Sequence, residues 1–409
     1  MVSEEGMMQK RKLLEGIKVI EYANFVAAPI SGRVLADWGA EVIKIEAAFG
    51  DTTRAVGMQW NFPTEEDECP LFEMENAGKK GIIIDTRQPE GAQVIYDLLE
   101  DADIFLTNTR QKALDKSGLD YKTIHEKYPH IIYAHLLGYG DKGPAKDNPA
   151  FDYTAYFARG GVAASLMETG TSPCNSAAAL GDHYAGMNLV AGVLAALHNK
   201  TITGEGEKVT VSLFHTAVFG LGLYVNAAQY GYNMPISRRQ PPNPLNTTYK
   251  CADDKWLQLA FFQYDKWFPG FCDIVIERSD LKGSKYSTMK SVVNCVEEFV
   301  GIMEQEFVKH PIDYWCERLQ KAGIPFEKLQ TPVDIMKDEQ CWANDFLINI
   351  KYRSGNERVM FTNPVQFPDR GTPEYVLSPK LGEHTEEVLK EIDYSDKKLA
   401  ELREKKVIN

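Results

Sequence analysis

The stretch "IKVIEYANFVAAPISGRVLADWGAEVIKIE" (residues 17–46) decides the expected fold of this chain. A short β-rich run (17–22) opens it, a helical segment (31–39) follows and ends at Gly39, and a second β-rich run (40–46) closes it. Two strands joined by a helix are the unit from which parallel sheets are built. The stretch therefore predicts the beginning of an α/β domain.

The same alternation continues beyond this stretch. Helical segments are expected at 88–102 and 183–198, and further β-rich runs stand at 81–85, 103–108, 130–140 and 207–212. Strands that alternate with helices predict one parallel sheet with crossover helices. After the first run stands "ANFVAAP" (23–29) and not G-x-G-x-x-G, so the dinucleotide-binding fingerprint is absent.

A Pro- and Asn-rich stretch, "NMPISRRQPPNPLN" (233–246), separates this pattern from a mostly helical one. We expect a Rossmann-like large domain with a parallel sheet and a smaller α+β domain. The expected boundaries are the first part of the large domain at 11–224, a linker at 225–246, the small domain at 247–330, a return linker at 331–345, and a C-terminal segment at 346–409 that returns to the large domain.

Composition excludes several classes of function. The 409 residues carry a net charge of −13, which argues against nucleic acid as a partner. The N-terminus lacks the apolar core of a signal peptide, and no run of about 18 apolar residues occurs, so we expect a cytoplasmic protein with no membrane partner. Seven scattered cysteines without C-x-x-C predict reduced thiols, and neither a zinc site nor a disulfide frame.

The candidate catalytic group is a carboxylate. No H-E-x-x-H, G-x-S-x-G or P-loop motif occurs, so nothing indicates metal catalysis, a serine hydrolase of the α/β type or a P-loop enzyme. In "AAALGDHYAGMNLVAGVLAALHNK" (177–200), Asp182 stands among small and apolar residues where a helix should begin. It is either the N-cap of that helix or a nucleophile kept ionised by the helix dipole. The residues alone favour the cap.

Seven separated stretches resemble the family III CoA-transferases, the formyl-CoA and carnitine CoA-transferase group, in the family's order along nearly the whole chain. The Asp of that family's "LGD" motif is the nucleophile, which implies this role for Asp182. Coenzyme A then acts as a thioester substrate, with no tightly bound cofactor and no metal. The stretches are residues 14–46, "GDTTR" (50–54), "ENAGKKGIIID" (75–85), "GLDY" (118–121), "ALGDHYAGMNLVAGVLAAL" (179–197), "TGEGEKVTVSLFHTAV" (203–218) and "SPKLGEHTEEVLKE" (378–391).

The resemblance also implies a CoA site, mostly at the carboxyl ends of the expected strands. At one of its positions relatives carry an adenine-contacting Arg, and this chain has Ala47. From the residues alone, Arg87, Arg110 and Lys116 are equally well solvated surface charges. The implied CoA-binding residues are Phe25, Val26, Ala27, Ala47, Ile84, Asp85, Arg87, Asn108, Thr109, Arg110, Lys116, Ala150 and Asp152.

Two other functions remain open. The α-methylacyl-CoA racemases share the fold and use a His–Asp pair to move a proton, but Phe151 stands at the His position here. The third possibility is a non-catalytic CoA-binding protein on a transferase fold, against which the intact "LGD" (180–182) argues.

A narrower resemblance concerns the substrate. "NPAFDYTAYFARGGV" (148–162), "LGDHYAGM" (180–187), "NPLNTTYKCADD" (243–254) and "DEQCWANDFL" (338–347) resemble the 2-hydroxyacyl-CoA transferases of anaerobic amino-acid fermenters, such as those for 2-hydroxyisocaproate and phenyllactate. This likeness implies transfer of CoA from an acyl-CoA or enoyl-CoA to an (R)-2-hydroxy acid. It implies metabolic coupling to a 2-hydroxyacyl-CoA dehydratase and an interlocked, ring-like homodimer.

Overall fold

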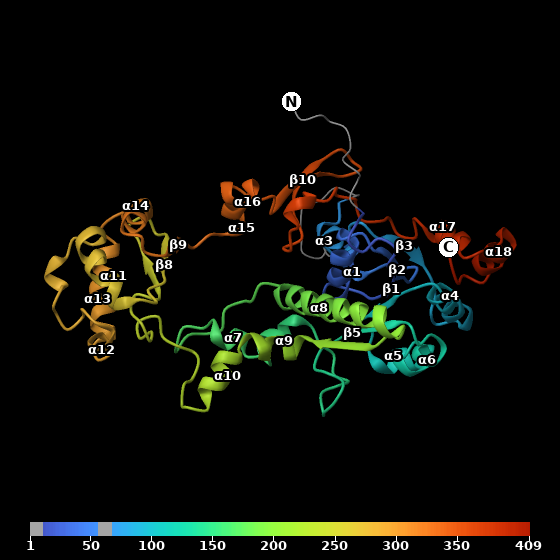
Figure 1. Cartoon of the computed structure of the whole chain (residues 1–409), viewed down its shortest axis with the longest axis horizontal. Helices are drawn as coiled ribbons and strands as arrows, with labels where there is room; N and C mark the ends of the chain where they lie inside the picture. Colours follow the sequence, from blue (N-terminus) through green and yellow to red (C-terminus); the bar gives the residue numbers. More distant parts are fainter. Residues whose placement is uncertain (1–10, 56–67) are drawn as a thin grey trace. The chain divides into compact units, whose positions relative to one another are not determined.

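The computed structural model describes residues 11–55 and 68–409 (Figure 1). The chain divides into two compact units. Unit 1 comprises residues 1–162, 175–225 and 340–409, and unit 2 comprises 163–174 and 226–339. In the described part of the chain, no helix is both long enough and apolar enough to cross a membrane.

Unit 1 contains a six-stranded parallel sheet, which confirms the α/β prediction. The strand order is β3-β2-β1-β4-β5-β6. The order reverses between β1 and β4, and ligands of doubly wound folds bind in the crevice at such a switch point. The strands are β1 (Lys18–Tyr22), β2 (Glu41–Glu46), β3 (Lys80–Ile83), β4 (Ile104–Thr107), β5 (Ile132–Leu137) and β6 (Lys208–Ser212).

Helices connect the strands as expected, although the bounds differ. The predicted helix 31–39 begins at Ala27, and the predicted helix 183–198 extends from Leu180 to Thr203, where Gly204 takes a left-handed conformation that ends it. The helices that lie in unit 1 or cross its boundary are α1 (Ala27–Asp37), α3 (Pro70–Asn76), α4 (Pro89–Leu99), α5 (Gln111–Ser117), α6 (Tyr121–Lys127), α7 (Val162–Ser165), α8 (Leu180–Thr203), α9 (Leu213–Gly220), α10 (Gly222–Ala228), α16 (Glu339–Ala343), α17 (Thr385–Glu391) and α18 (Asp396–Glu404).

The C-terminal segment covers the β3 edge of the sheet. The antiparallel hairpin β10 (Leu347–Lys351) and β11 (Glu357–Phe361) precedes it. The backbone N–H of Gly81 donates to Nδ1 of His384 at 3.1 Å, and that of Ile83 donates to Oγ1 of Thr385 at 3.1 Å. An edge strand whose N–H groups are used in this way does not offer them to another chain.

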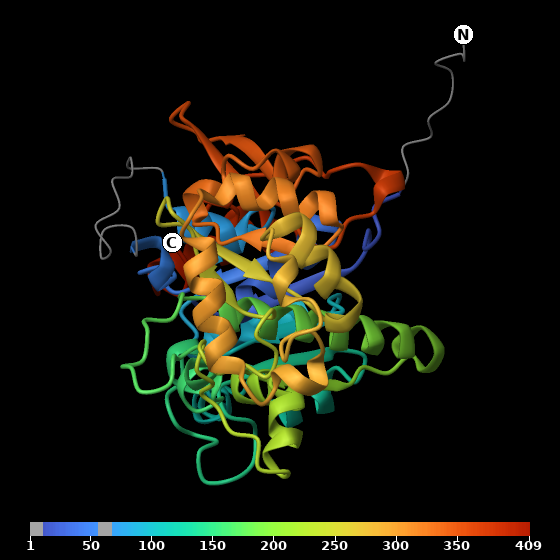
Figure 2. The ribbon, with the colours of Figure 1, turned by 90° about the vertical axis from the view of Figure 1, so that its left-hand side faces the viewer.

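Unit 2 has its own core around a three-stranded antiparallel sheet of order β7-β8-β9. Figure 2, in which this unit faces the viewer, shows its helices around the short strands. Its elements are β7 (Thr248–Lys250), β8 (Trp256–Leu259), α11 (Tyr264–Gly270), α12 (Met289–Val292), α13 (Val296–Phe307), α14 (Ile312–Ala322), β9 (Phe326–Lys328) and α15 (Pro332–Ile335).

Candidate active site

Asp182 lies in the first turn of α8, but it is not the N-cap. The cap position belongs to Ala179, which takes a left-handed conformation with φ of 69° and makes no side-chain cap hydrogen bond. Asp182 is the third residue of the helix, so the N-cap interpretation is wrong. Its carboxylate is therefore not used to terminate the helix.

Two glycines, Gly181 and Gly186, allow α8 to pack closely against its neighbours, because a side chain at either position would clash. A Cβ at Gly181 would lie 2.4 Å from Cγ of Tyr156, in the π-helical turn Tyr153–Ala158. A Cβ at Gly186 would lie 2.3 Å from Cγ2 of Ile30 and 2.8 Å from the carbonyl oxygen of Ala27 on α1. Because residues i and i+4 share one face of a helix, Asp182 lies on the face of α8 that packs on α1.

Asp182 belongs to a cluster of three carboxyl groups and one imidazole. Burial, followed by the negative charges of Asp152 and Glu75, raises the pKa of Asp182 to about 7, and the charge of His183 opposes this rise. Desolvation and like charges thus oppose the helix dipole that we expected to keep Asp182 ionised. A carboxylate with a pKa near neutrality is characteristic of functional sites.

His183 is held from the other side by α3. Its Nε2 lies 2.9 Å from Oε1 of Glu75, whose side chain is fully buried. The other oxygen of Glu75, Oε2, has no hydrogen-bond partner among the described residues, and the same holds for Oδ2 of Asp152. Oδ1 of Asp152 accepts the backbone N–H of Tyr153 at 2.7 Å.

The residues implied for CoA binding follow the carboxyl ends of five parallel strands, with one exception. Lys116 lies exposed toward the end of α5. Arg87 is exposed and forms a two-point ion pair with Asp85, in which Nε lies 2.8 Å from Oδ1 and Nη2 lies 2.9 Å from Oδ2. After β1 come Phe25, Val26 and Ala27, after β2 Ala47, after β3 Ile84, Asp85 and Arg87, after β4 Asn108, Thr109 and Arg110, and after β5 Ala150 and Asp152. The structure thus brings these segments to one edge of the sheet.

The switch point itself is built by two asparagines. Oδ1 of Asn108 accepts the N–H of Asn24 at 3.0 Å, and Nδ2 of Asn108 donates to the carbonyl of Asn24 at 2.7 Å. Phe25, next in the chain, takes a left-handed conformation with φ of 64°. Its ring contacts that of Phe151 edge-on, with centroids 5.3 Å apart.

The chain matches the family model for CoA-transferase family III over residues 14–385. It belongs to CoA-transferase family III. It is 50% identical over 97% of its length to the (R)-2-hydroxy-4-methylpentanoate CoA-transferase of Clostridioides difficile, of which 99% is covered. It is 45% identical over 98% of its length to the cinnamoyl-CoA:phenyllactate CoA-transferase of Clostridium sporogenes, of which 98% is covered. The chain is thus a CoA-transferase, as its sequence motifs implied.

A solved structure supports the fold. The CAIB/BAIF family protein from Brucella suis superposes with a TM-score of 0.79 at 27% identity, covering 93% of this chain and 99% of that one. Among the residues described here, no group of three or more His, Cys, Asp or Glu side chains is arranged to hold a metal ion.

Beside this site of the family III fold lies a buried ionic network that the sequence analysis missed. Nζ of Lys44 lies 3.2 Å from Oε1 of Glu21 and 3.0 Å from Oδ2 of Asp51, and Nζ of Lys79 lies 2.7 Å from Oε2 of Glu21. Oδ1 of Asp51 accepts the backbone N–H of Phe25 at 3.2 Å, which connects the network to the switch point. The one available signal was the presence of Glu21 and Lys44 inside two β-rich runs that were expected to be buried in the sheet.

Removing one cation from this network should destabilise the fold. Lys44→Met leaves Asp51 buried without its ion pair, and breaking a buried pair in this way costs about 3–5 kcal/mol. We expect a clearly lower urea-unfolding midpoint. The control is Lys122→Met, whose side chain is 84% exposed and 3.9 Å from Glu126, and which should stay within about 0.5 kcal/mol of the parent. Equal midpoints for the two variants would contradict the role of the network.

Proposed function

We propose that this enzyme transfers CoA from an acyl-CoA or enoyl-CoA to an (R)-2-hydroxy acid such as 2-hydroxyisocaproate, with Asp182 as the nucleophile. The observation that carries the substrate class is the 50% identity, over nearly both full lengths, to a transferase named for 2-hydroxy-4-methylpentanoate, which is the same acid. The placement of Asp182 supports its role, because this carboxylate is half-buried, feels the charge of Asp152 and does not serve as a helix cap.

The proposed chemistry conserves the thioester bond energy. The Asp182 carboxylate attacks the thioester carbonyl of the donor, CoA thiolate leaves, and a mixed anhydride forms. The thiolate then attacks the Asp182 carbonyl, which gives an aspartyl-CoA thioester and releases the donor acid. The acceptor carboxylate attacks this thioester and forms a second anhydride, and the released thiolate attacks the acceptor carbonyl. A new acyl-CoA departs and the Asp182 carboxylate is restored.

The proposed CoA site is the crevice at the carboxyl edge of the sheet. The loop of Phe25 to Ala27 and the turn of Asn108 and Thr109 flank the switch point, where doubly wound folds bind ligands. The exposed Arg110 and Lys116, at opposite ends of α5, can bring positive charge to the phosphates of CoA. Ala47 supplies no cation, so the adenine end would be held without the arginine that relatives use there.

The residues at the site do not support the racemase alternative. A racemase requires a group that moves the proton at the carbon next to the thioester. Phe151 stands where those enzymes have histidine, and its ring has no ionisable nitrogen. The 2-hydroxyacyl-CoA product of a transferase would instead be consumed by a dehydratase, as the narrower sequence resemblance implies.

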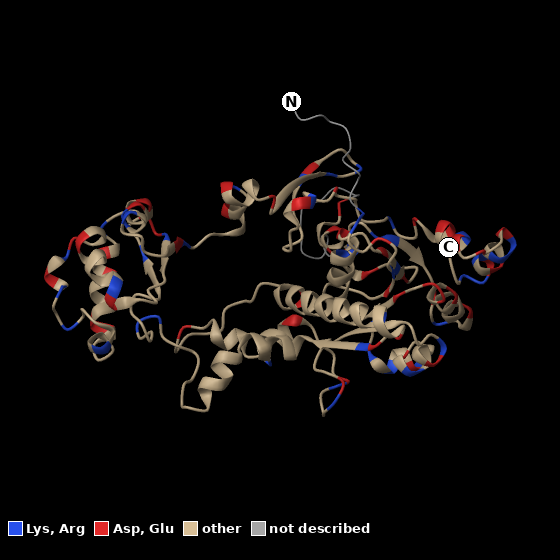
Figure 3. Cartoon of the chain, viewed as in Figure 1, with Lys and Arg blue, Asp and Glu red and all other residues tan. Residues whose placement is uncertain are grey.

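We also propose that the enzyme is an interlocked homodimer in which the linkers 225–246 and 331–345 join the domains of each subunit. No charged residue occurs from Leu213 to Ser237, and Figure 3 shows α9 and α10 without acidic or basic colour. Phe219, Leu223 and Tyr230 are 81%, 74% and 90% exposed. Apolar surface of this extent marks an interface.

Light scattering tests the proposed dimer. It should give twice the chain mass of 46.0 kDa, and a value equal to the chain mass would refute the dimer.

Replacement of Asp182 should abolish exchange. Asp182→Ala and Asp182→Asn should fold but lose several orders of magnitude in kcat, because positioning alone remains once a covalent nucleophile is removed. The matched control is Asp396→Asn in the surface helix α18, which should keep the parent rate.

The covalent intermediate tests the same proposal directly. Incubation with a donor acyl-CoA, without acceptor, followed by acid quenching and digestion, should place CoA on the peptide containing "LGDHYAGM" (180–187). Hydroxylamine should convert Asp182 to a hydroxamate. If Asp182→Asn stays active and neither adduct nor hydroxamate forms, CoA passes between the acids without this carboxylate.

An acceptor series tests the substrate class. 2-Hydroxyisocaproate has three more carbons than lactate, and each buried methylene contributes about 0.8 kcal/mol. We therefore expect kcat/KM for 2-hydroxyisocaproate to exceed that for lactate by roughly thirtyfold or more. Phenyllactate tests the other relative's acid, and 4-methylpentanoate, which lacks only the hydroxyl, is the matched control. Equal use of 4-methylpentanoate would show that the enzyme is not selective for 2-hydroxy acids.

A further inference from the structure

The side chain beside the proposed nucleophile is held in an unusual environment. His183 follows Asp182 directly in α8, and its Nε2 lies 2.9 Å from the fully buried Oε1 of Glu75 on α3. Burial alone would lower the pKa of His183, but the hydrogen bond and charge of Glu75, together with the charges of Asp182 and Asp152, outweigh burial and raise this pKa. The imidazole is thus biased toward its charged form.

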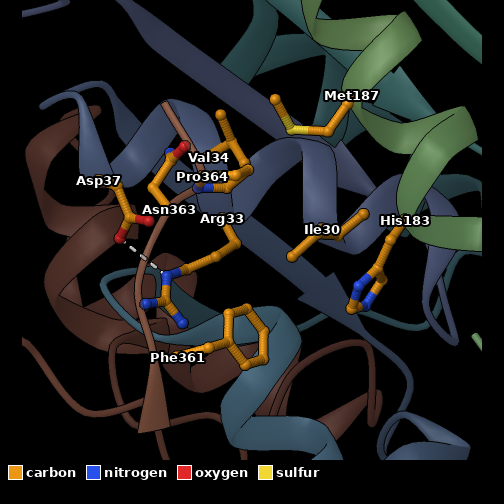
Figure 4. A pocket seen from close by; sticks show the side chains of 9 residues that line it. All are labelled: Ile30, Arg33, Val34, Asp37, His183, Met187, Phe361, Asn363 and Pro364. Atoms are coloured by element: carbon orange, nitrogen blue, oxygen red, sulfur yellow. Dashed lines mark hydrogen bonds and ion pairs between the residues drawn. The ribbon is translucent and has the colours of Figure 1, made fainter. Parts of the chain in front are cut away.

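Charged side chains from several packed elements surround the imidazole of His183. Asp182 lies on its own helix, Asp152 precedes the π-helical turn, and Glu75 approaches from α3. From α1, Arg33 and Asp37 line the same small cavity of about 60 Å³, but they pair with each other, with Nε of Arg33 2.8 Å from Oδ1 of Asp37 (Figure 4).

The same cavity is otherwise apolar where it meets His183. Met187 lies one turn further along α8, Ile30 faces it from α1, and Phe361 of β11 closes one side, with its ring centroid 6.0 Å from that of His183. Of the groups that alter the charge balance at Asp182, two are acidic and raise its pKa, and His183 alone lowers it. A positive charge on His183, the next residue of α8, would therefore favour the carboxylate form of Asp182.

We propose that His183, oriented by Glu75, is a positioning residue whose positive charge keeps Asp182 ionised for attack on the thioester. The proposal rests on Asp182 being the nucleophile. His183 itself forms no bond with the substrate in this proposal. It opposes the negative charges of Asp152 and Glu75 at a partly buried site, where opposite charges interact more strongly than in bulk water.

The test is the pH profile of kcat/KM in two variants. His183→Gln removes the charge, so the acidic limb should move to higher pH by about one unit. The loss should be about tenfold at pH 6 and less than twofold at pH 9, since at pH 9 the carboxyl group is ionised in both proteins. His183→Arg keeps a permanent charge that can bond both oxygens of Glu75, and the adjoining cavity gives it room. The acidic limb of the His183→Arg variant should have its midpoint at the same pH as that of the parent, or at a lower pH.

The control and the opposing outcome are specific. His198→Gln, on the same helix, should leave the limb unchanged. If His183→Gln lowers kcat/KM by the same factor at all pH values, or if His183→Arg moves the limb upward as His183→Gln does, His183 has only a structural role and the proposal is wrong. Circular dichroism checks that the variants fold. If His183→Gln does not fold, the direction in which His183→Arg shifts the acidic limb of the pH profile tests the proposal.

Failure of this proposal can be told apart from failure of Asp182 as the nucleophile. If the CoA adduct forms on Asp182 in the parent but the acidic limb of the pH profile does not respond to the His183 charge, Asp182 is the nucleophile and the role proposed for His183 is wrong. If no adduct forms and Asp182→Asn remains active, both the nucleophilic role of Asp182 and the positioning role of His183 are wrong.

Discussion

The backbone-to-backbone approach of α8 to α1 at Gly186 is the constraint on which the site depends. A side chain there would meet Ile30 and the carbonyl of Ala27, and the carbonyl of Gly186 instead accepts the hydroxyl of Ser31 at 3.1 Å. This contact fixes the start of α8 beside the first βα turn of the sheet. The carboxylate one turn before Gly186 is consequently brought out of bulk water.

Burial of that carboxylate has two opposing consequences. A desolvated carboxylate is a stronger nucleophile than a hydrated one, but burial favours its protonated and unreactive form. The fold meets this conflict with charge. A chain segment far away in sequence, α3, supplies Glu75, which lies 2.9 Å from the imidazole next to Asp182 and raises the pKa of that imidazole. The packing of α1, α3 and α8 therefore influences the ionisation of the Asp182 carboxyl group.

The sequence predicts the sheet well because its strands and helices have distinct local patterns. The alternation of β-rich and helical segments placed all six parallel strands to within a few residues. It did not place the start of α8, because Ala179 adopts a left-handed conformation for which alanine has no preference. The buried ionic network was missed because Lys44 and Lys79 lie 23 and 58 residues from Glu21, in segments that only the fold brings together. The proposed role of Asp182 came from a family motif, whereas local propensity favoured an N-cap that the structure does not contain.

The same fold serves different chemistry, so the crevice must specify the reaction through a few side chains. An aspartyl anhydride survives only where water is excluded. Around the carboxyl cluster, however, Phe25, Phe151 and Tyr153 are 37%, 52% and 49% exposed in a single chain. Aromatic rings placed beside a buried carboxylate exclude water only when something covers them. In the proposed mechanism and the proposed homodimer, the bound CoA arm and a second copy of the chain complete the apolar enclosure, so that binding and assembly together protect the proposed aspartyl intermediate.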